Sequence, residues 1–163
     1  ERWKSRISMT RYQGQRAVGG VTALEHGLEH TVQAFSALQV PVVLFRDVPN
    51  QQGDVPTAVL RGLSATTLRD RTATEQALNA SAITEQENRE DQARANGILA
   101  AVQQRHPDAV IIGDLSAPLC RQGLCPWADN GVFLYHDGNH LTIAGAERTK
   151  DTIARTLANL PRR

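Results

Sequence analysis

Apolar and polar positions along this chain predict a helix, a strand, a further helical region and a second strand, in that order. Between Thr22 and Leu38, apolar residues recur at three- and four-residue steps, which predicts a helix with one buried face. Two continuous apolar runs rich in β-branched residues, 40–46 and 109–113, predict strands buried on both faces, and Asp114 follows the second. The apolar positions of the first helix are Leu24, Leu28, Val32, Phe35 and Leu38.

The region between the two runs predicts a loop and one long helix. Residues 51–74 carry Gly, Pro, Thr and Asp with little periodicity, which is typical of a loop. Thr74 or Ser81 is then the expected cap of a helix that runs to about Arg105. His106 is expected to cap its C-terminal end.

The C-terminal part of the chain predicts a short extended segment, 131–135, and a closing amphipathic helix, 142–160. Strands that alternate with helices indicate an α/β layer architecture with a parallel sheet. Only two core strands are visible, whereas comparable doubly wound domains have about five. We therefore expect the strand at 40–46 to have an open edge in this chain alone. The inward positions expected for the closing helix are Ile143, Ala146, Ile153, Leu157 and Leu160.

Size and charge narrow the classes of function. A chain of 163 residues fits a single domain, and its 18 basic and 17 acidic residues give a net charge of only +1. No basic stripe interleaved with aromatic residues is present, which argues against nucleic acid as a partner. No apolar run approaches the roughly 20 residues that a transmembrane helix needs.

Two cysteines lie close together, Cys120 and Cys125, with Gly123 between them to permit a tight loop. This spacing can close a small disulfide, and the alternative is two reduced structural thiols. An oxidised pair would indicate an exported domain.

The strongest candidate for chemistry is the pair Asp137 and His140, three residues apart in a turn before the closing helix. Acyl transfer by a serine needs an imidazole that takes the hydroxyl proton and a carboxylate that orients that imidazole. Asp137 and His140 have the spacing to supply both from one turn. The alternative is a capped helix start, in which Asp137 or Thr142 accepts backbone N–H bonds and His140 is merely solvated.

Two histidine pairs have the four-residue spacing of metal ligands on a helix. His26 and His30 have no third ligand nearby, so a solvated helix face is the favoured interpretation. A site formed by His136, Asp137 and His140 is disfavoured because a Gly-Asn pair between the histidines disfavours a helix there. We expect neither a metal nor any other cofactor.

The stretch Tyr135-His-Asp137-Gly-Asn-His140-Leu-Thr-Ile-Ala-Gly-Ala146 resembles the last motif block of SGNH (GDSL-type) hydrolases, in which an Asp-x-x-His turn holds the catalytic Asp and His. Together with Leu119-Cys120 and Cys125, it is similar to the SGNH domain fused behind acyltransferase-3 membrane proteins, which O-acetylate bacterial surface polysaccharides. The resemblance implies a flavodoxin-like three-layer α/β fold with a parallel sheet. It also implies that Asp137 is the acid and His140 the base of a catalytic triad.

The chain departs from that family at the nucleophile. It contains no Gly-Asp-Ser motif, and the nearest approach, Gly113-Asp-Leu-Ser116, has one residue too many. We interpret it as a strand end and a loop, with Ser116 as a displaced nucleophile kept as the lesser alternative. We therefore expect residues 1–163 to form a single partial domain, the C-terminal portion of the fold, with the serine upstream of Glu1. Residues 1–19 are expected to be either a disordered tail or the end of a missing strand.

The resemblance also implies the partners and the function. The expected partners are an acyl donor, a carbohydrate acceptor and a membrane acyltransferase domain in the same parent chain, on the periplasmic side of the bacterial inner membrane. The expected function is acyl transfer, specifically of acetyl groups, to cell-surface carbohydrate by a Ser-His-Asp mechanism whose serine lies outside this chain. The alternatives are a carbohydrate esterase of the SGNH type and a non-catalytic, export-side sugar-binding module.

Overall fold

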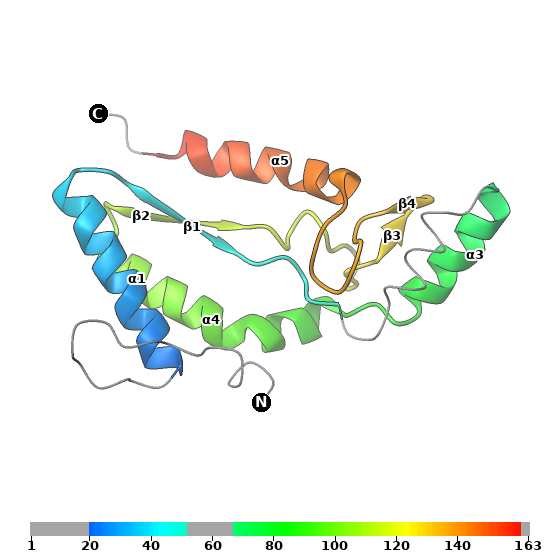
Figure 1. The fold of residues 1–163 in the computed structure, drawn as a ribbon, viewed down its shortest axis with the longest axis horizontal. Coiled ribbons are helices and arrows are strands. Elements are labelled where there is room, and N and C mark those ends of the chain that lie inside the picture. The colour runs from blue at the N-terminus through cyan, green and yellow to red at the C-terminus, as the bar shows by residue number, and fades with distance from the viewer. Residues whose placement is uncertain (1–19, 52–66, 161–163) are drawn as a thin grey trace.

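A computed structural model gives the fold and describes residues 20–51 and 67–160. Two parallel strands, β1 (Val42–Arg46) and β2 (Val110–Asp114), form the middle layer. Helices α1 and α4 lie on one side of this pair and α5 lies on the other (Figure 1). The α/β layer architecture with a parallel sheet, predicted from the alternation of strands and helices, is thereby confirmed, and so are the three layers that the family resemblance implies.

The covering helices begin and end close to the positions that the apolar spacing predicts. Helix α1 spans Gly20–Ala37, α4 spans Glu85–Arg105 and α5 spans Ile143–Ala158. His106 caps the C-terminal end of α4, as expected, and its imidazole also contacts Glu29 of α1. This contact fastens the end of α4 to α1.

The strand pair runs in parallel register from Val42 opposite Val110 to Arg46 opposite Asp114. Among the described residues β1 has no second neighbour, which agrees with the predicted open edge. The prediction that the strand at 40–46 is buried on both faces is wrong, because every residue of β1 is only half-buried. The reason is that β1 is covered incompletely within the described part of the chain.

A second unit lies beyond the end of the sheet that holds the strands' carboxyl termini. It consists of α3 (Leu68–Asn79) and a short antiparallel hairpin, β3 (Ala128–Asp129) and β4 (Val132–Phe133). Asn79 joins them, because its amide oxygen accepts from the Trp127 N–H at 2.8 Å and its amide nitrogen donates to the Ala128 carbonyl at 2.9 Å. The end of α3 is therefore fixed to the hairpin by backbone-directed hydrogen bonds.

Two clusters of apolar side chains form the core. One lies between α1, α4 and the sheet and contains Val32, Ile98, Val102 and Val110. The other lies around the hairpin and contains Val48, Leu78, Leu119, Trp127, Ala128, Phe133, Leu134 and Tyr135. Leu134 and Tyr135 of the second cluster directly precede the Asp-x-x-His turn in the chain. The turn therefore starts from a buried, well-packed segment.

The expectation of a loop at 51–74 followed by one long helix is wrong in the part that the structure describes. Residues 52–66 lie outside the described residues, but α3 already begins at Leu68. The caps are Thr67 and Thr84, and Thr84 forms a reciprocal capping box with the third residue of α4. Two N-terminal caps thus divide the region into two helices.

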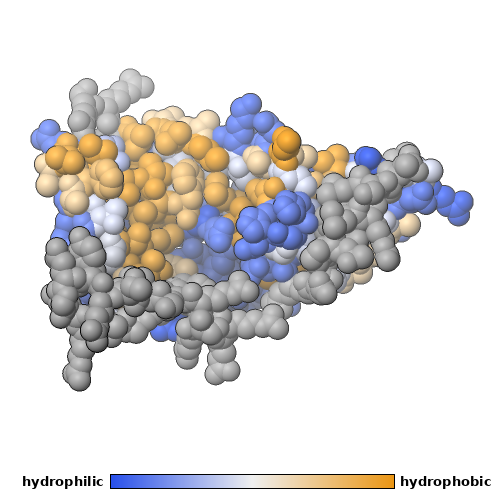
Figure 2. All heavy atoms as spheres, viewed as in Figure 1, coloured by the Kyte–Doolittle hydropathy of each residue, from blue (hydrophilic) through white to orange (hydrophobic). Residues whose placement is uncertain are grey.

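The predicted inward face of α1 is correct only over its first part. Val32 is buried and Leu24 and Leu28 pack against the same cluster, whereas Phe35 is exposed and Leu38 is 70% exposed. Figure 2 shows apolar side chains gathered over β1 and the neighbouring part of α5. The open strand edge and these apolar residues indicate that this side of the domain is suited to packing against further protein.

The predicted inward face of α5 also needs correction. Ile143 is 86% exposed and Leu157 is exposed, while Gly145, Thr149 and Thr156 are the buried residues of this helix. Small side chains face the sheet because α5 approaches the chain before the turn very closely. A Cβ atom on Gly145 would lie 3.0 Å from the Leu134 carbonyl carbon and closer still to its oxygen.

We predict that Gly145→Ala destabilises the fold by about 1–3 kcal/mol, because the added methyl group would collide with a backbone carbonyl that cannot rotate away. Gly97→Ala in α4 is the matched control. A Cβ atom there meets nothing within 4 Å, so this change should stabilise the fold by up to about 1 kcal/mol through helix propensity. Urea unfolding followed by circular dichroism measures both. Effects of the same sign in the two variants would contradict the packing described here.

Candidate active site

The Asp-x-x-His turn is closed by backbone hydrogen bonds at two levels. The His136 N–H donates to the His140 carbonyl at 2.9 Å, and the Thr142 N–H donates to the Leu134 carbonyl at 2.9 Å. Thr142 then caps α5, since its hydroxyl oxygen accepts from the Gly145 N–H at 3.1 Å. The turn is therefore held between the hairpin side of the core and the start of α5.

Asp137 organises the inside of this turn. Its Oδ1 accepts from the backbone N–H groups of Asn139 at 3.0 Å and His140 at 2.8 Å, and its Oδ2 lies 2.7 Å from His140 Nδ1. Burial opposes ionisation, but the bonds from the Asn139 and His140 N–H groups and from the imidazole outweigh it and lower the pKa of Asp137 to about 2. The carboxyl group is therefore ionised at neutral pH.

The charge of Asp137 decides the tautomer of His140. An ionised carboxylate can only accept, so the neutral imidazole must carry its proton on Nδ1 and donate it to Asp137. This leaves the lone pair on Nε2, in a side chain that is 69% exposed. An oriented imidazole with a free, accessible Nε2 is the arrangement that a general base requires.

Gln51 holds the Asp-x-x-His turn by hydrogen bonds to neighbouring segments. The sequence patterns did not predict this role. The N–H of Gln51 donates to the Gly138 carbonyl at 2.7 Å, so it holds the tip of the turn directly. Its buried side chain donates to the Cys125 carbonyl at 2.7 Å and accepts from the Ile83 N–H at 3.1 Å. One glutamine thus joins the turn to the disulfide loop and to the start of α4. No local signal marks this role, because the partners of the side chain lie 74 and 32 residues away in sequence.

Two aromatic residues near the turn belong to the core. Trp127 and Tyr135 are fully buried and meet edge to face, with ring centroids 5.8 Å apart and an interplanar angle of 74°. Burial raises the pKa of the Tyr135 hydroxyl, which therefore stays protonated at neutral pH. Neither ring is accessible for stacking on a sugar, so their role is packing.

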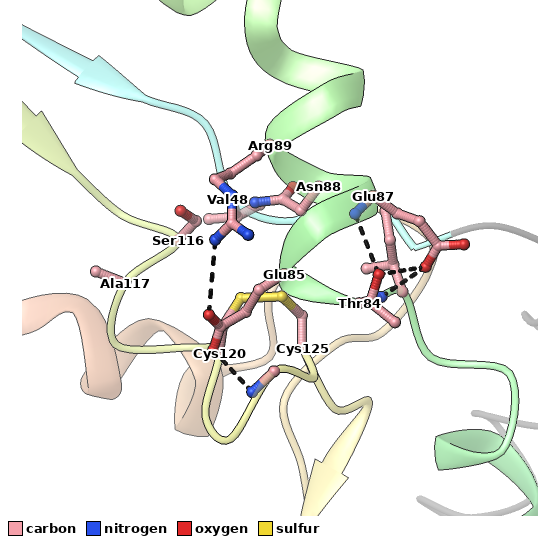
Figure 3. The surroundings of a disulfide bond; sticks show 12 residues. Val48, Thr84, Glu85, Glu87, Asn88, Arg89, Ser116, Ala117, Cys120 and Cys125 are labelled. Atoms are coloured by element: carbon pink, nitrogen blue, oxygen red, sulfur yellow. Dashed lines mark hydrogen bonds and ion pairs between the residues drawn. A yellow bond between two sulfur atoms is a disulfide. The ribbon is translucent and has the colours of Figure 1, made fainter.

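Cys120 and Cys125 form the predicted disulfide (Figure 3). The loop they close packs against the start of α4, where the Cys125 N–H donates to the Ile83 carbonyl and the Glu85 N–H donates to the Gly123 carbonyl, each at 2.9 Å. The loop is therefore part of the same scaffold that Gln51 joins to the turn.

A buried carboxylate connects the disulfide loop to α5. Asp129 accepts two hydrogen bonds from the Arg121 guanidinium, and Arg148 Nη2 of α5 lies 2.7 Å from its Oδ2. Burial alone would raise the pKa of Asp129, but the two guanidinium groups hold it below its usual value. This ion pair network fixes α5, and with it the end of the Asp-x-x-His turn, to the loop.

Ser116 does not meet the imidazole. Its hydroxyl donates to Asp114 Oδ1 at 2.6 Å, and Asp114 Oδ2 lies 3.3 Å from Arg46 Nη1 at the end of the neighbouring strand. In the described ranges, neither Ser116 nor the other two serines, Ser36 and Ser81, has a hydrogen bond to His140. These contacts support the interpretation that Ser116 belongs to the loop after β2.

The two histidine pairs considered as metal ligands belong to no set of metal-binding side chains in the part of the chain that the structure describes. Within residues 20–51 and 67–160, no group of three or more His, Cys, Asp or Glu side chains is arranged to hold a metal ion. His26 and His30 are exposed on α1. His136 lies beside His140 with its ring stacked on it, and the two rings have centroids 6.0 Å apart.

The three layers, the disulfide loop and the ordered Asp-His pair together define an SGNH-type α/β domain. Comparison with protein families identifies the group: the family described as "SGNH domain (fused to AT3 domains)" matches residues 1–155, and the chain belongs to that family. The fusion associates the chain with a membrane acyltransferase domain and with chemistry of the acyltransferase or esterase type.

Searches among curated proteins and among solved structures found no significant match. None of the helices in the described ranges is both long and apolar enough to cross a membrane.

The low pKa of Asp137 predicts how the turn responds to acid. Because the folded-state value of about 2 lies below the usual 3.8, ionised Asp137 contributes stability at pH values above 3.8, and this contribution is lost as the pH falls through about 2. A carboxyl ¹³C NMR titration should therefore give a midpoint near 2 for Asp137. His140→Ala should move that midpoint upward, because the imidazole bond that helps to lower the pKa of Asp137 is removed. A wild-type midpoint at or above the usual value would contradict the hydrogen bonding described.

Gln51→Ala should destabilise the fold by about 2–4 kcal/mol, because it leaves the buried Ile83 N–H and Cys125 carbonyl without partners. Gln104→Ala, an exposed position of α4, is the control and should change stability by less than about 0.5 kcal/mol. Thermal and urea unfolding measure the difference. Equal stability of the two variants would show that the side-chain hydrogen bonds of Gln51 do not stabilise the fold.

Proposed function

We propose that this chain supplies the acid and the base of a serine-dependent acyl transfer to carbohydrate. The observation that carries the proposal is the Asp137–His140 pair, in which the carboxylate fixes the Nδ1–H tautomer and leaves Nε2 free and exposed. Such a pair matches the requirement of acyl transfer for an oriented imidazole. A solvated helix cap would need neither the contact between Nδ1 and the carboxylate nor its 2.7 Å length.

In the first half of the proposed reaction, His140 Nε2 takes the proton of a serine hydroxyl as the serine oxygen attacks the acyl carbonyl carbon. Asp137 stabilises the imidazolium that results. His140 then gives this proton to the oxygen of the leaving group, and the acyl group stays on the serine as an ester. In the second half, His140 takes the proton of a sugar hydroxyl as the sugar oxygen attacks the acyl-serine ester. It then returns this proton to the departing serine oxygen, which leaves the acylated sugar, a free serine hydroxyl and a neutral imidazole.

The proposed nucleophile and the oxyanion donors lie outside the described residues. Supporting this, the three serines of the described ranges are held away from His140 or have no bond to it. The open edge of β1 suits the addition of a further strand, and exposed Phe35 and Leu38 add apolar surface near the amino end of β1. A serine at the end of an added strand would reach the same end of the sheet as the turn.

Acetyl or another short acyl group is the proposed cargo, and a cell-surface polysaccharide is the proposed acceptor. The association of the family with membrane acyltransferase domains favours transfer over hydrolysis, since such a domain is a source of acyl groups on one polypeptide. The disulfide favours the periplasmic side of the bacterial inner membrane, where oxidised cysteines persist. Water in place of the sugar hydroxyl would make the same site an esterase.

His140→Ala in the full parent protein, expressed with its membrane domain, should lower polysaccharide acetylation by roughly 10³-fold or more, because the serine loses its base. Asp137→Asn should lower it strongly as well, since the amide no longer fixes the tautomer. His30→Ala on α1 is the control and should leave acetylation unchanged. Acetyl groups are counted by NMR of the purified polysaccharide.

Two other results separate the alternatives. Acetylation that persists in His140→Ala would contradict the proposal, and sugar binding without any acyl transfer by the wild type would favour a binding module. Release of acetate from acetylated polysaccharide, lost in His140→Ala, would identify an esterase that uses the same pair.

A further inference from the structure

His136 lies in the same turn as the catalytic pair and has no part in the mechanism above. Its ring stacks against that of His140, with centroids 6.0 Å apart and an interplanar angle of 26°. The backbone places the two rings together, because the His136 N–H donates to the His140 carbonyl and closes the turn. The stacking is therefore built into the turn.

An exposed base needs more than one contact to keep its orientation. The His140 side chain is 69% exposed, and its one side-chain hydrogen bond, to Asp137, allows the ring to pivot about that bond. The ring of His136 stacks beside the imidazole at an inclination of 26°, and this contact opposes such a pivot. His136 itself is 61% exposed, so it has no other evident packing role.

His136 also lies close to the shared carboxylate without displacing His140 from it. His136 Nδ1 is 3.9 Å from Asp137 Oδ2, which is too long for a hydrogen bond, whereas His140 Nδ1 is 2.7 Å from the same oxygen. Both rings therefore lie near the carboxylate, while only His140 is bonded to it.

We propose that His136 is a positioning residue: its ring stacks on His140 and holds the imidazole with Nδ1 on Asp137 and Nε2 toward the reacting serine. This inference rests on the proposed function for its effect on the rate, but its structural content does not. The size of the effect follows from the strength of an aromatic pair, which corresponds to roughly two- to ten-fold in rate.

Activity of the full parent protein tests the effect on the rate. His136→Ala should lower kcat roughly two- to ten-fold and leave KM unchanged, because His136 contacts the base and not the substrate. His136→Phe should restore kcat, since the phenyl ring can stack but cannot bond to Asp137. His30→Ala is the control for a change of an exposed histidine. A wild-type kcat in His136→Ala, or a kcat in His136→Phe as low as in His136→Ala, would overturn the proposal.

A spectroscopic measurement keeps this test separate from that of the proposed function. Ring ¹⁵N shifts of His140, measured at a pH where the imidazole is neutral, should show the single Nδ1–H tautomer in the wild type and in His136→Phe. His136→Ala should show a fraction of the Nε2–H tautomer as well, because a ring that pivots away from Asp137 loses the bond that fixes its proton on Nδ1. If His140→Ala retains acyl transfer while these shifts behave as stated, the proposed function fails and the positioning role stands. Identical His140 shifts in all three proteins would overturn the positioning role whatever the activity.

Discussion

The shape of the Asp-x-x-His turn depends on the hydrogen bonds of one buried residue, Gln51. Its backbone holds Gly138 at the tip of the turn, and its side chain bonds to the disulfide loop and to Ile83, the residue before the N-cap of α4. The bonds within the turn fix its local shape, and those of Gln51 fasten it to the rest of the domain. Because Gln51 is buried, each of these bonds is protected from competition by water.

A second constraint acts from the other end of the turn. Helix α5 begins against the Leu134 carbonyl, an approach that only a glycine at position 145 allows. Arg148, further along α5, bonds to buried Asp129 and so ties the helix to the hairpin. The turn is thus fixed at its tip by Gln51 and at its exit by α5, and this fixes the direction in which His140 projects.

Hydrophobic periodicity predicted the elements that have long regular patterns. Helix α1, both strands of the sheet and α5 were found close to their predicted positions, and so was the disulfide. The start of α3 fell in the predicted loop at 51–74, and the expected cap of the single long helix, Thr74 or Ser81, was wrong. Several Thr and Ser residues in this region could serve as caps, and the pattern does not distinguish Thr67 and Thr84 from the others. The hairpin strands of two residues each are too short to show an alternating pattern.

Only the local part of the candidate site could be predicted, because sequence patterns report contacts between residues that are close in the chain. Asp137 and His140 are neighbours in sequence, so their spacing alone suggested their contact, although their catalytic role stays a proposal. Gln51 was not predicted, because its bonds span distant segments. The inward face of α5 was misassigned because its buried positions are small or polar: Thr156 Oγ1 lies where a Cβ atom on Gly113 would collide with it. Periodicity favours large apolar residues and does not register such close approach.

The most direct test of the central claim is covalent labelling of the parent protein with a fluorophosphonate probe, which reacts with a serine activated by a base. We expect one labelled serine, located by mass spectrometry outside residues 20–51 and 67–160, and loss of the label in His140→Ala. Labelling that is unaffected by His140→Ala, or that falls on Ser116, would contradict the claim that Asp137 and His140 are the acid and base of acyl transfer.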